Sequence, residues 1–163
     1  MIPLRDDLPT RSAPILTITF IVACCVVFLW QISLGERGFQ VAVYSLGVIP
    51  ATLLGKETLP PEFFHIPPTL TVFSSMFLHG GWMHLIGNML YLWIFGNNVE
   101  DSMGHARFVI FYLACGVAAA LVQALPNPDS VIPMIGASGA ISGVLGAYLL
   151  LHPRAHVLVL VPL

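Results

Sequence analysis

Apolar positions form long uninterrupted runs along this chain, and charged residues gather between the runs. The first run covers residues 14–34 and contains no acidic or basic side chain. Three further apolar stretches follow at about 82–98, 106–125 and 136–152. A helix needs about 20 mostly apolar residues to cross the hydrocarbon core of a bilayer, which is roughly 30 Å thick. The pattern therefore predicts an all-α membrane protein, a polytopic helical bundle with four spans in this chain.

The basic residues predict the sidedness of these spans. Cytoplasmic loops of membrane proteins carry an excess of Lys and Arg. An inside N-terminus puts four of the six basic residues in the cytoplasm, namely Arg5, Arg11, Arg107 and Arg154. We therefore expect a cytoplasmic N-terminal segment at 1–13, a single membrane domain at 14–163, and a multi-pass protein of the plasma (inner) membrane. The starts of the second and fourth spans then lie on one side of the membrane.

Residues 35–69 interrupt the apolar pattern with Gly, Pro, aromatic and charged residues. We expect a long connecting loop here. Its aromatic and aliphatic side chains allow two arrangements, one in which the segment lies in the membrane interface and one in which it packs as an extramembrane loop.

Composition narrows the class of protein further. Hydrophobic residues make up 57% of the chain and charged residues 9%, with a mean hydropathy of +0.89. Soluble domains usually carry about 25% charged residues. The formal charge is only −2 and no basic run is present, so we expect no nucleic-acid partner. Cys24, Cys25 and Cys115 lie in apolar stretches and are expected to be small core residues without disulfides.

Polar side chains within the second predicted span call for an explanation, because such groups are costly in a membrane. His84 and Asn88 are four residues apart, so a helix presents both on one face. His79 lies just before this span and can belong to the same polar cluster as His84 and Asn88. Either these residues face a cavity where chemistry occurs, or they make hydrogen bonds to neighbouring helices.

The fourth predicted span begins with small residues around Ser138. Glycines at 139, 143 and 146 let a neighbouring helix approach closely. The first backbone N–H groups of a helix lack intrahelical acceptors and favour negative charge, so an oxyanion can be held beside Ser138. His84 and Asn88 would add donors to such a site. The alternative is a packing helix on which Ser138 is the N-cap.

These residues resemble the rhomboid family of intramembrane serine proteases. Three stretches carry the resemblance: His-Gly-Gly-Trp-Met-His-Leu-Ile-Gly-Asn at 79–88, Gly-Asn-Asn-Val-Glu-Asp at 96–101, and Gly-Ala-Ser-Gly-Ala-Ile-Ser-Gly at 136–143. The resemblance implies a core of six transmembrane helices, of which this chain would supply four. It also implies no metal and no organic cofactor.

The resemblance assigns roles to five residues of this chain. Ser138 would be the nucleophile within a motif whose backbone is completed by Gly136 and Gly139. His84 and Asn88 would stabilise the oxyanion. The implied activity is cleavage of transmembrane or juxtamembrane segments of membrane proteins, so the partners would be such proteins and the lipid bilayer.

The chain departs from the family pattern in its general base. Rhomboids use a histidine on the sixth helix, and none of the histidines here matches it: His65, His79, His84, His105, His152 and His156. An apolar run begins at 156–163 and stops, so we expect the base to lie beyond residue 163 and the 163-residue chain alone to be inactive. The Trp-Arg dipeptide that many members carry in the first loop is absent, and Ser142 stands where some members have a tyrosine.

Two other functions remain open from the sequence. One is a catalytically inactive rhomboid-like protein that binds transmembrane clients. The other is a transporter or metal-binding bundle that uses His79, His84 and Asn88. This last reading needs carboxylate or thiolate partners at the same depth, whereas Glu100 and Asp101 are expected at the opposite end of the span.

Overall fold

The computed structural model describes residues 2–63 and 66–161. Its long helices are α1 (Ile15–Ser33), α5 (Trp82–Met103), α6 (His105–Ala124) and α7 (Ser138–Leu151). Shorter helices and turns are α2 (Gly35–Leu46), α3 (Pro50–Leu53), η1 (Pro61–Phe63), η2 (Pro68–Leu70), α4 (Thr71–Ser74) and η3 (Ser75–Phe77). Two strands, β1 (Ile2–Asp6) and β2 (Val157–Leu160), complete the described elements. The predicted all-α membrane fold is confirmed.

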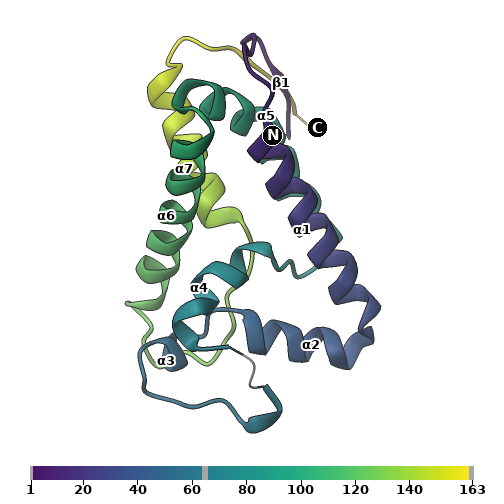
Figure 1. Cartoon of the computed structure of the whole chain (residues 1–163), viewed down its shortest axis with the longest axis vertical. Helices are drawn as coiled ribbons and strands as arrows, with labels where there is room; N and C mark the ends of the chain where they lie inside the picture. Colours follow the sequence, from purple (N-terminus) through teal and green to yellow (C-terminus); the bar gives the residue numbers. More distant parts are fainter. Residues whose placement is uncertain (1, 64–65, 162–163) are drawn as a thin grey trace.

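The long helices pack around α7. Helix α7 contacts both α5 and α6, and α1 packs against α5. Figure 1 shows α1 running away from β1 along one side of the molecule, α2 turning across the opposite end, and α6 and α7 along the other side. Large fully buried side chains from these helices, including Phe28, Leu92, Phe108, Tyr112 and Val144, form the core. The helix that begins at Ser138 is therefore enclosed by two neighbours.

Glycines on α7 fit it closely against α6. A Cβ atom on Gly139 would lie 2.5 Å from Cβ of Ala119, and one on Gly143 would lie 2.4 Å from Sγ of Cys115. Both distances are far below van der Waals contact, so any larger residue would push the helices apart. A Cβ on Gly146 would meet open space. Two of the three glycines in the predicted packing face, Gly139 and Gly143, therefore allow α6 to pack closely against α7.

Two of the helices, α1 and α6, are long and apolar enough to cross a membrane. Helix α5 has 22 residues but carries polar side chains, and α7 has only 14 residues. At about 1.5 Å per residue, α7 is shorter than a bilayer core. The topology with four spans stays a prediction.

The segment after α1 differs from the expected loop. Residues Gly35–Leu46 form helix α2, which buries Ala42 and Val43 and leaves Glu36 and Arg37 exposed. Gly35, with φ of +70°, allows the sharp change of direction between α1 and α2. The apolar positions 39, 42, 43 and 46 follow a helical period, and the many Gly, Pro and charged residues of the segment obscured it.

The remainder of that segment is tied to the chain just before α7. The Val48 N–H donates to the Met134 carbonyl at 3.0 Å, and the Met134 N–H returns a bond of 2.7 Å to the Val48 carbonyl. The Ala51 N–H donates to the Ser130 carbonyl at 3.0 Å. These bonds favour the packed-loop alternative for the region around Val48.

A carboxylate, that of Glu100 on α5, stabilises the start of α1. Glu100 accepts hydrogen bonds from the backbone N–H groups of Leu16 and Thr17, at 2.9 and 2.8 Å, and from the Thr17 hydroxyl at 2.7 Å. This satisfies the free N–H groups at the start of α1. Strands β1 and β2 pair antiparallel beside it, with Ile2 opposite Leu160 and Asp6 opposite Val157. The sequence did not predict this sheet, because both strands are too short to show a pattern.

Candidate active site

The residue that leads into α7, Gly136, occupies a position that only glycine suits. Gly136 has φ of +118°, a conformation that residues with a side chain rarely adopt. Its N–H donates to the Ser75 carbonyl at 2.8 Å, which fixes the segment over η3. Ala137 is the N-cap and makes no side-chain cap hydrogen bond, and Ser138 is the first helical residue. The alternative in which Ser138 caps the helix is therefore wrong.

Helix α5 brings His84 and Asn88 to the same glycine. A Cβ atom on Gly136 would lie 2.6 Å from Nε2 of His84 and 3.7 Å from Nδ2 of Asn88. Both side chains therefore reach the backbone two residues before Ser138. The two nitrogen-bearing groups share one face of α5, as their spacing in the sequence predicted, and both lie at the start of α7.

One hydrogen bond indicates which nitrogen of His84 carries the proton. The Gly80 N–H donates to Nδ1 of His84 at 3.3 Å, so Nδ1 acts as the acceptor. In a neutral imidazole the other nitrogen then carries the hydrogen. We assign the proton to Nε2, which makes His84 a hydrogen-bond donor on the side facing Gly136.

Asn88 offers a donor that nothing else uses. The residue is only 9% exposed, and among the described residues its Nδ2 has no hydrogen-bond partner. Leaving a buried amide donor unpaired costs about 1–3 kcal/mol, so such groups call for a reason. A donor held ready for a charge that forms only during a reaction supplies one.

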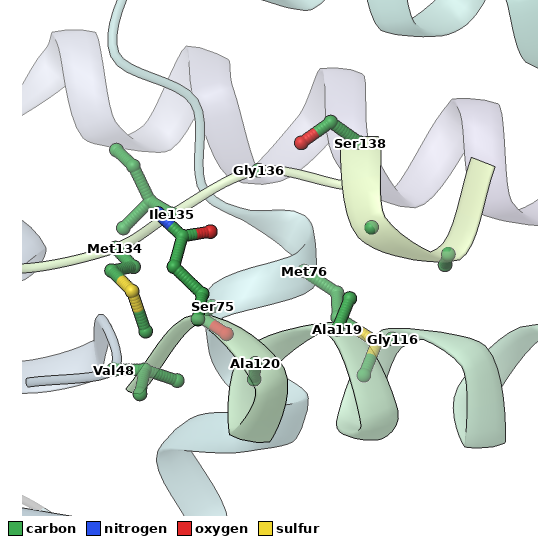
Figure 2. Close-up of a pocket in the computed structure, with 13 residues that line it drawn as sticks. Val48, Ser75, Met76, Gly116, Ala119, Ala120, Met134, Ile135, Gly136 and Ser138 are labelled. Carbon is green, nitrogen blue, oxygen red and sulfur yellow. The ribbon is translucent and has the colours of Figure 1, made fainter. Parts of the chain in front are cut away.

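Ser138 itself is exposed between two hollows. A groove of about 350 Å³ between α5 and α7 is lined in part by His84, Asn88, Ser138 and Ser142. On the other side, a cavity of about 60 Å³ is lined in part by Ser75, Gly136 and Ser138. Figure 2 shows the Ser138 hydroxyl pointing from the first turn of α7 back toward Gly136 and Ile135. The hydroxyl is thus accessible to another molecule.

Ser142, one turn further along α7, is in a different position. Its hydroxyl donates to the Ser138 carbonyl at 2.8 Å. This bond occupies the Ser142 proton within the helix. Ser142 lines the same groove but is less available for chemistry than Ser138.

His79 lies behind His84. The two rings meet edge to face with centroids 5.1 Å apart. His79 is fully buried, and its backbone N–H donates to Oε1 of Gln31 on α1 at 3.0 Å. His79 therefore supports the His84 ring. Gln31, which sequence analysis did not single out, is an amide within the first apolar run, and this isolated polarity was the available signal.

The other described histidines lie at the opposite end of the bundle. His105 pairs with Glu100 at 2.6 Å, His152 contacts the Ser102 hydroxyl at 3.2 Å, and His156 pairs with Asp7 at 2.9 Å. His152 is fourteen residues beyond Ser138 along α7, which is about 20 Å at the helical rise. His65 lies outside the described residues. In the part of the chain that the structure describes, His84 is thus the histidine next to Ser138.

Comparison with known proteins identifies the family. A family model described as the Rhomboid domain matches residues 68–163, more than half of the chain. The mitochondrial Rhomboid protein 1 of Saccharomyces cerevisiae is 33% identical over 130 residues, which cover 76% of this chain and 37% of that protein. Rhomboid protease GluP of Bacillus subtilis is 42% identical over 76 residues, covering 47% of this chain and 14% of the relative.

Similar proteins also include relatives from plants. RHOMBOID-like protein 5 of Arabidopsis thaliana is 38% identical over 76 residues, covering 47% of this chain and 25% of the relative. The chain thus spans well under half the length of these relatives. The apolar helices agree with an integral membrane protein. The chain belongs to the rhomboid family.

Proposed function

We propose that this chain provides the nucleophile and the oxyanion-binding groups of an intramembrane serine endopeptidase. The observation that carries the proposal is the convergence of Nε2 of His84 and the unpaired Nδ2 of Asn88 on the backbone leading into Ser138. A serine hydroxyl beside preorganised donors is the arrangement that acyl transfer requires. Gly136 leaves room for His84 and Asn88 beside this backbone, whereas Gly139 lets Ala119 of α6 approach the start of α7.

In the proposed reaction, Oγ of Ser138 attacks the carbonyl carbon of the scissile peptide bond. The serine proton passes to a base, and the carbonyl oxygen becomes an oxyanion held by His84 and Asn88. The C–N bond then breaks, the amine leaves with the proton, and an acyl-enzyme remains. Water attacks the ester carbonyl and regenerates Ser138, again with proton transfer through the base.

The base in this proposal is a histidine outside residues 1–163. Among the described histidines, His105, His152 and His156 lie at the opposite end of the bundle, and His79 is fully buried behind His84. His84 itself is assigned as a donor. A general base contributes about 100- to 10,000-fold to such a reaction. Residues 1–163 on their own should therefore show no serine-dependent proteolysis.

The substrates in this proposal are transmembrane or juxtamembrane segments of other membrane proteins. The groove beside Ser138 is lined by apolar side chains such as Met83, Ile141 and Leu145, next to the polar pair. Such a surface suits an apolar segment whose backbone must be exposed to be cut. In this proposal the protein lies in the plasma (inner) membrane and its N-terminus is on the cytoplasmic side. Some relatives are named as mitochondrial or chloroplastic.

The proposal is tested with the full-length protein, reconstituted with a fluorogenic transmembrane substrate. Ser138→Ala should abolish cleavage, whereas the matched variant Ser142→Ala should retain most of it. Activity that survives Ser138→Ala would refute the proposal. Binding of the substrate without cleavage by the unaltered protein would instead favour a rhomboid-like protein that only binds transmembrane clients.

A further inference from the structure

We propose that Asp6 is a positioning residue that sets the spacing between the two helices bearing the candidate site. This inference rests on the proposed function, because it concerns the geometry of the same site. One oxygen of Asp6, Oδ2, accepts hydrogen bonds from two helices at once. The donors are Nδ2 of Asn98 on α5 and the hydroxyl of Tyr148 on α7, the latter at 2.9 Å.

The two donors lie at matching depths. Asn98 is ten residues after Asn88 on α5, and Tyr148 is ten residues after Ser138 on α7. Each is therefore about 15 Å along its helix from the candidate site. The helices meet at Gly136 near their starts and at Asp6 near their ends, so they run in the same direction. Asp6 thus joins them at the end opposite the site.

The contact is partly buried and reinforced by packing. Asn98 and Tyr148 are each only 3% exposed. The Tyr148 ring packs against Phe95 of α5 with centroids 4.9 Å apart. At a partly buried site an accepted hydrogen bond is worth more than at the surface. Losing the acceptor removes the bond from the Tyr148 hydroxyl and leaves Nδ2 of Asn98 with its bond to Oδ1 of Asn97. Asp6 therefore contributes to the packing of α5 against α7.

Strand β1 holds Asp6 in place. Asp6 lies opposite Val157 in the β1–β2 pair. The contacts of the next residue, Asp7, with the N–H and the ring of His156, both at 2.9 Å, are exposed and lie outside this strand pair. Strand β1 contacts α5, and Figure 1 shows it at the end of the molecule opposite α2 and α3. A segment at the start of the chain thereby contacts residues that lie 92 and 142 positions later in the sequence.

The consequence for catalysis is geometric. His84 and Asn88 belong to α5, whereas Ser138 belongs to α7, so the fit of oxyanion donors to the nucleophile depends on the spacing of these helices. Misplacing reacting groups by about 1 Å can cost roughly 100-fold in rate. A modest change in helix spacing should therefore lower kcat while leaving KM nearly unchanged.

The test compares three variants of the full-length protein. Asp6→Ala removes the acceptor and should lower kcat about tenfold, with KM changed less than about twofold. Asp6→Asn keeps an oxygen that can accept both bonds and should restore most of kcat. The matched control Asp7→Ala, which loses only the His156 contacts, should keep kcat within about twofold of the unaltered protein. Equal losses in Asp6→Ala and Asp7→Ala, or no rescue by Asp6→Asn, would overturn the inference.

A second measurement does not depend on activity. Cysteines introduced as Gly87→Cys on α5 and Leu145→Cys on α7 both line the groove, and a Cβ at position 87 meets nothing within 4 Å. Thiol cross-linkers of graded length, with cross-linked peptides identified by mass spectrometry, report the spacing of the helices. Asp6→Ala should change the preferred linker length and Asp7→Ala should not. An unchanged preference would refute the positioning role even if Ser138 proved not to be the nucleophile.

Discussion

The imidazole of His84 lies directly against the backbone of Gly136, with Nε2 only 2.6 Å from the position that a Cβ atom would occupy. Gly136 also has φ of +118°. Two independent constraints, space and backbone conformation, therefore demand glycine here. Their joint effect is to bring a ring nitrogen close to the main chain two residues before Ser138.

This relationship predicts that Gly136→Ala disrupts the site. The substitution would force the backbone from its conformation, at a cost of about 1–3 kcal/mol, and would displace the His84 ring. We expect cleavage to fall about 100-fold or more and the melting temperature to drop. Gly146→Ala is the control, because a Cβ there meets open space, and it should be nearly neutral. Gly136→Ala with full activity would contradict the described geometry.

The oxyanion role of the pair on α5 predicts a kinetic signature. His84→Ala and Asn88→Ala should each lower kcat about 100- to 1,000-fold and leave KM nearly unchanged, because an oxyanion donor acts mainly in the transition state. Steady-state kinetics on a transmembrane substrate, together with melting temperatures, check this. Variants that lose only thermal stability or expression would show that the two side chains are structural.

The close contact between α6 and α7 predicts a reciprocal pair of substitutions. Gly139→Ala places a methyl group 2.5 Å from Cβ of Ala119 and should destabilise the protein by about 1–3 kcal/mol. Adding Ala119→Gly removes the opposing Cβ and should restore most of the loss. Thermal unfolding in detergent measures both variants. Failure of the second substitution to rescue the first would mean that Gly139 matters for another reason.

The strand contact at Asp7 predicts sensitivity to acid. Hydrogen bonds from the His156 backbone N–H and then from its ring hold the pKa of the Asp7 carboxyl below its ordinary value. A lowered folded-state pKa means that the contact contributes fully above the ordinary value of about 3.9 and is lost as the pH falls through the folded value. Hydrogen-exchange protection of β1 should therefore decrease below about pH 4. Asp7→Asn should remove this dependence, and an unaltered pH profile in that variant would be evidence against it.

Much of the candidate site could be predicted from the sequence because its parts follow helical spacing. His84 and Asn88 share a face through the spacing of four, and the alternation of spans puts them at the same level as Ser138. The close fit of α7 also follows from Gly139 and Gly143. These are local patterns that tertiary structure preserved.

The parts that sequence analysis missed depend on contacts between distant segments. Nothing local to Asp6 indicates that it reaches Tyr148, which lies 142 residues away. The N-cap alternative for Ser138 failed because the conformation of Gly136 shifts the cap to Ala137. The helix at Gly35–Leu46 was hidden by residues typical of loops, although its buried face follows a helical period.

The most direct test of the central claim is the position of a covalent adduct. The full-length protein is treated with a serine-directed fluorophosphonate, and the modified residue is located by mass spectrometry. We expect the reagent to phosphonylate Ser138 and cleavage to be lost in parallel. Asn88→Ala should slow this modification. An adduct on Ser142 or another residue, or cleavage that continues when Ser138 is fully modified, would contradict the central claim.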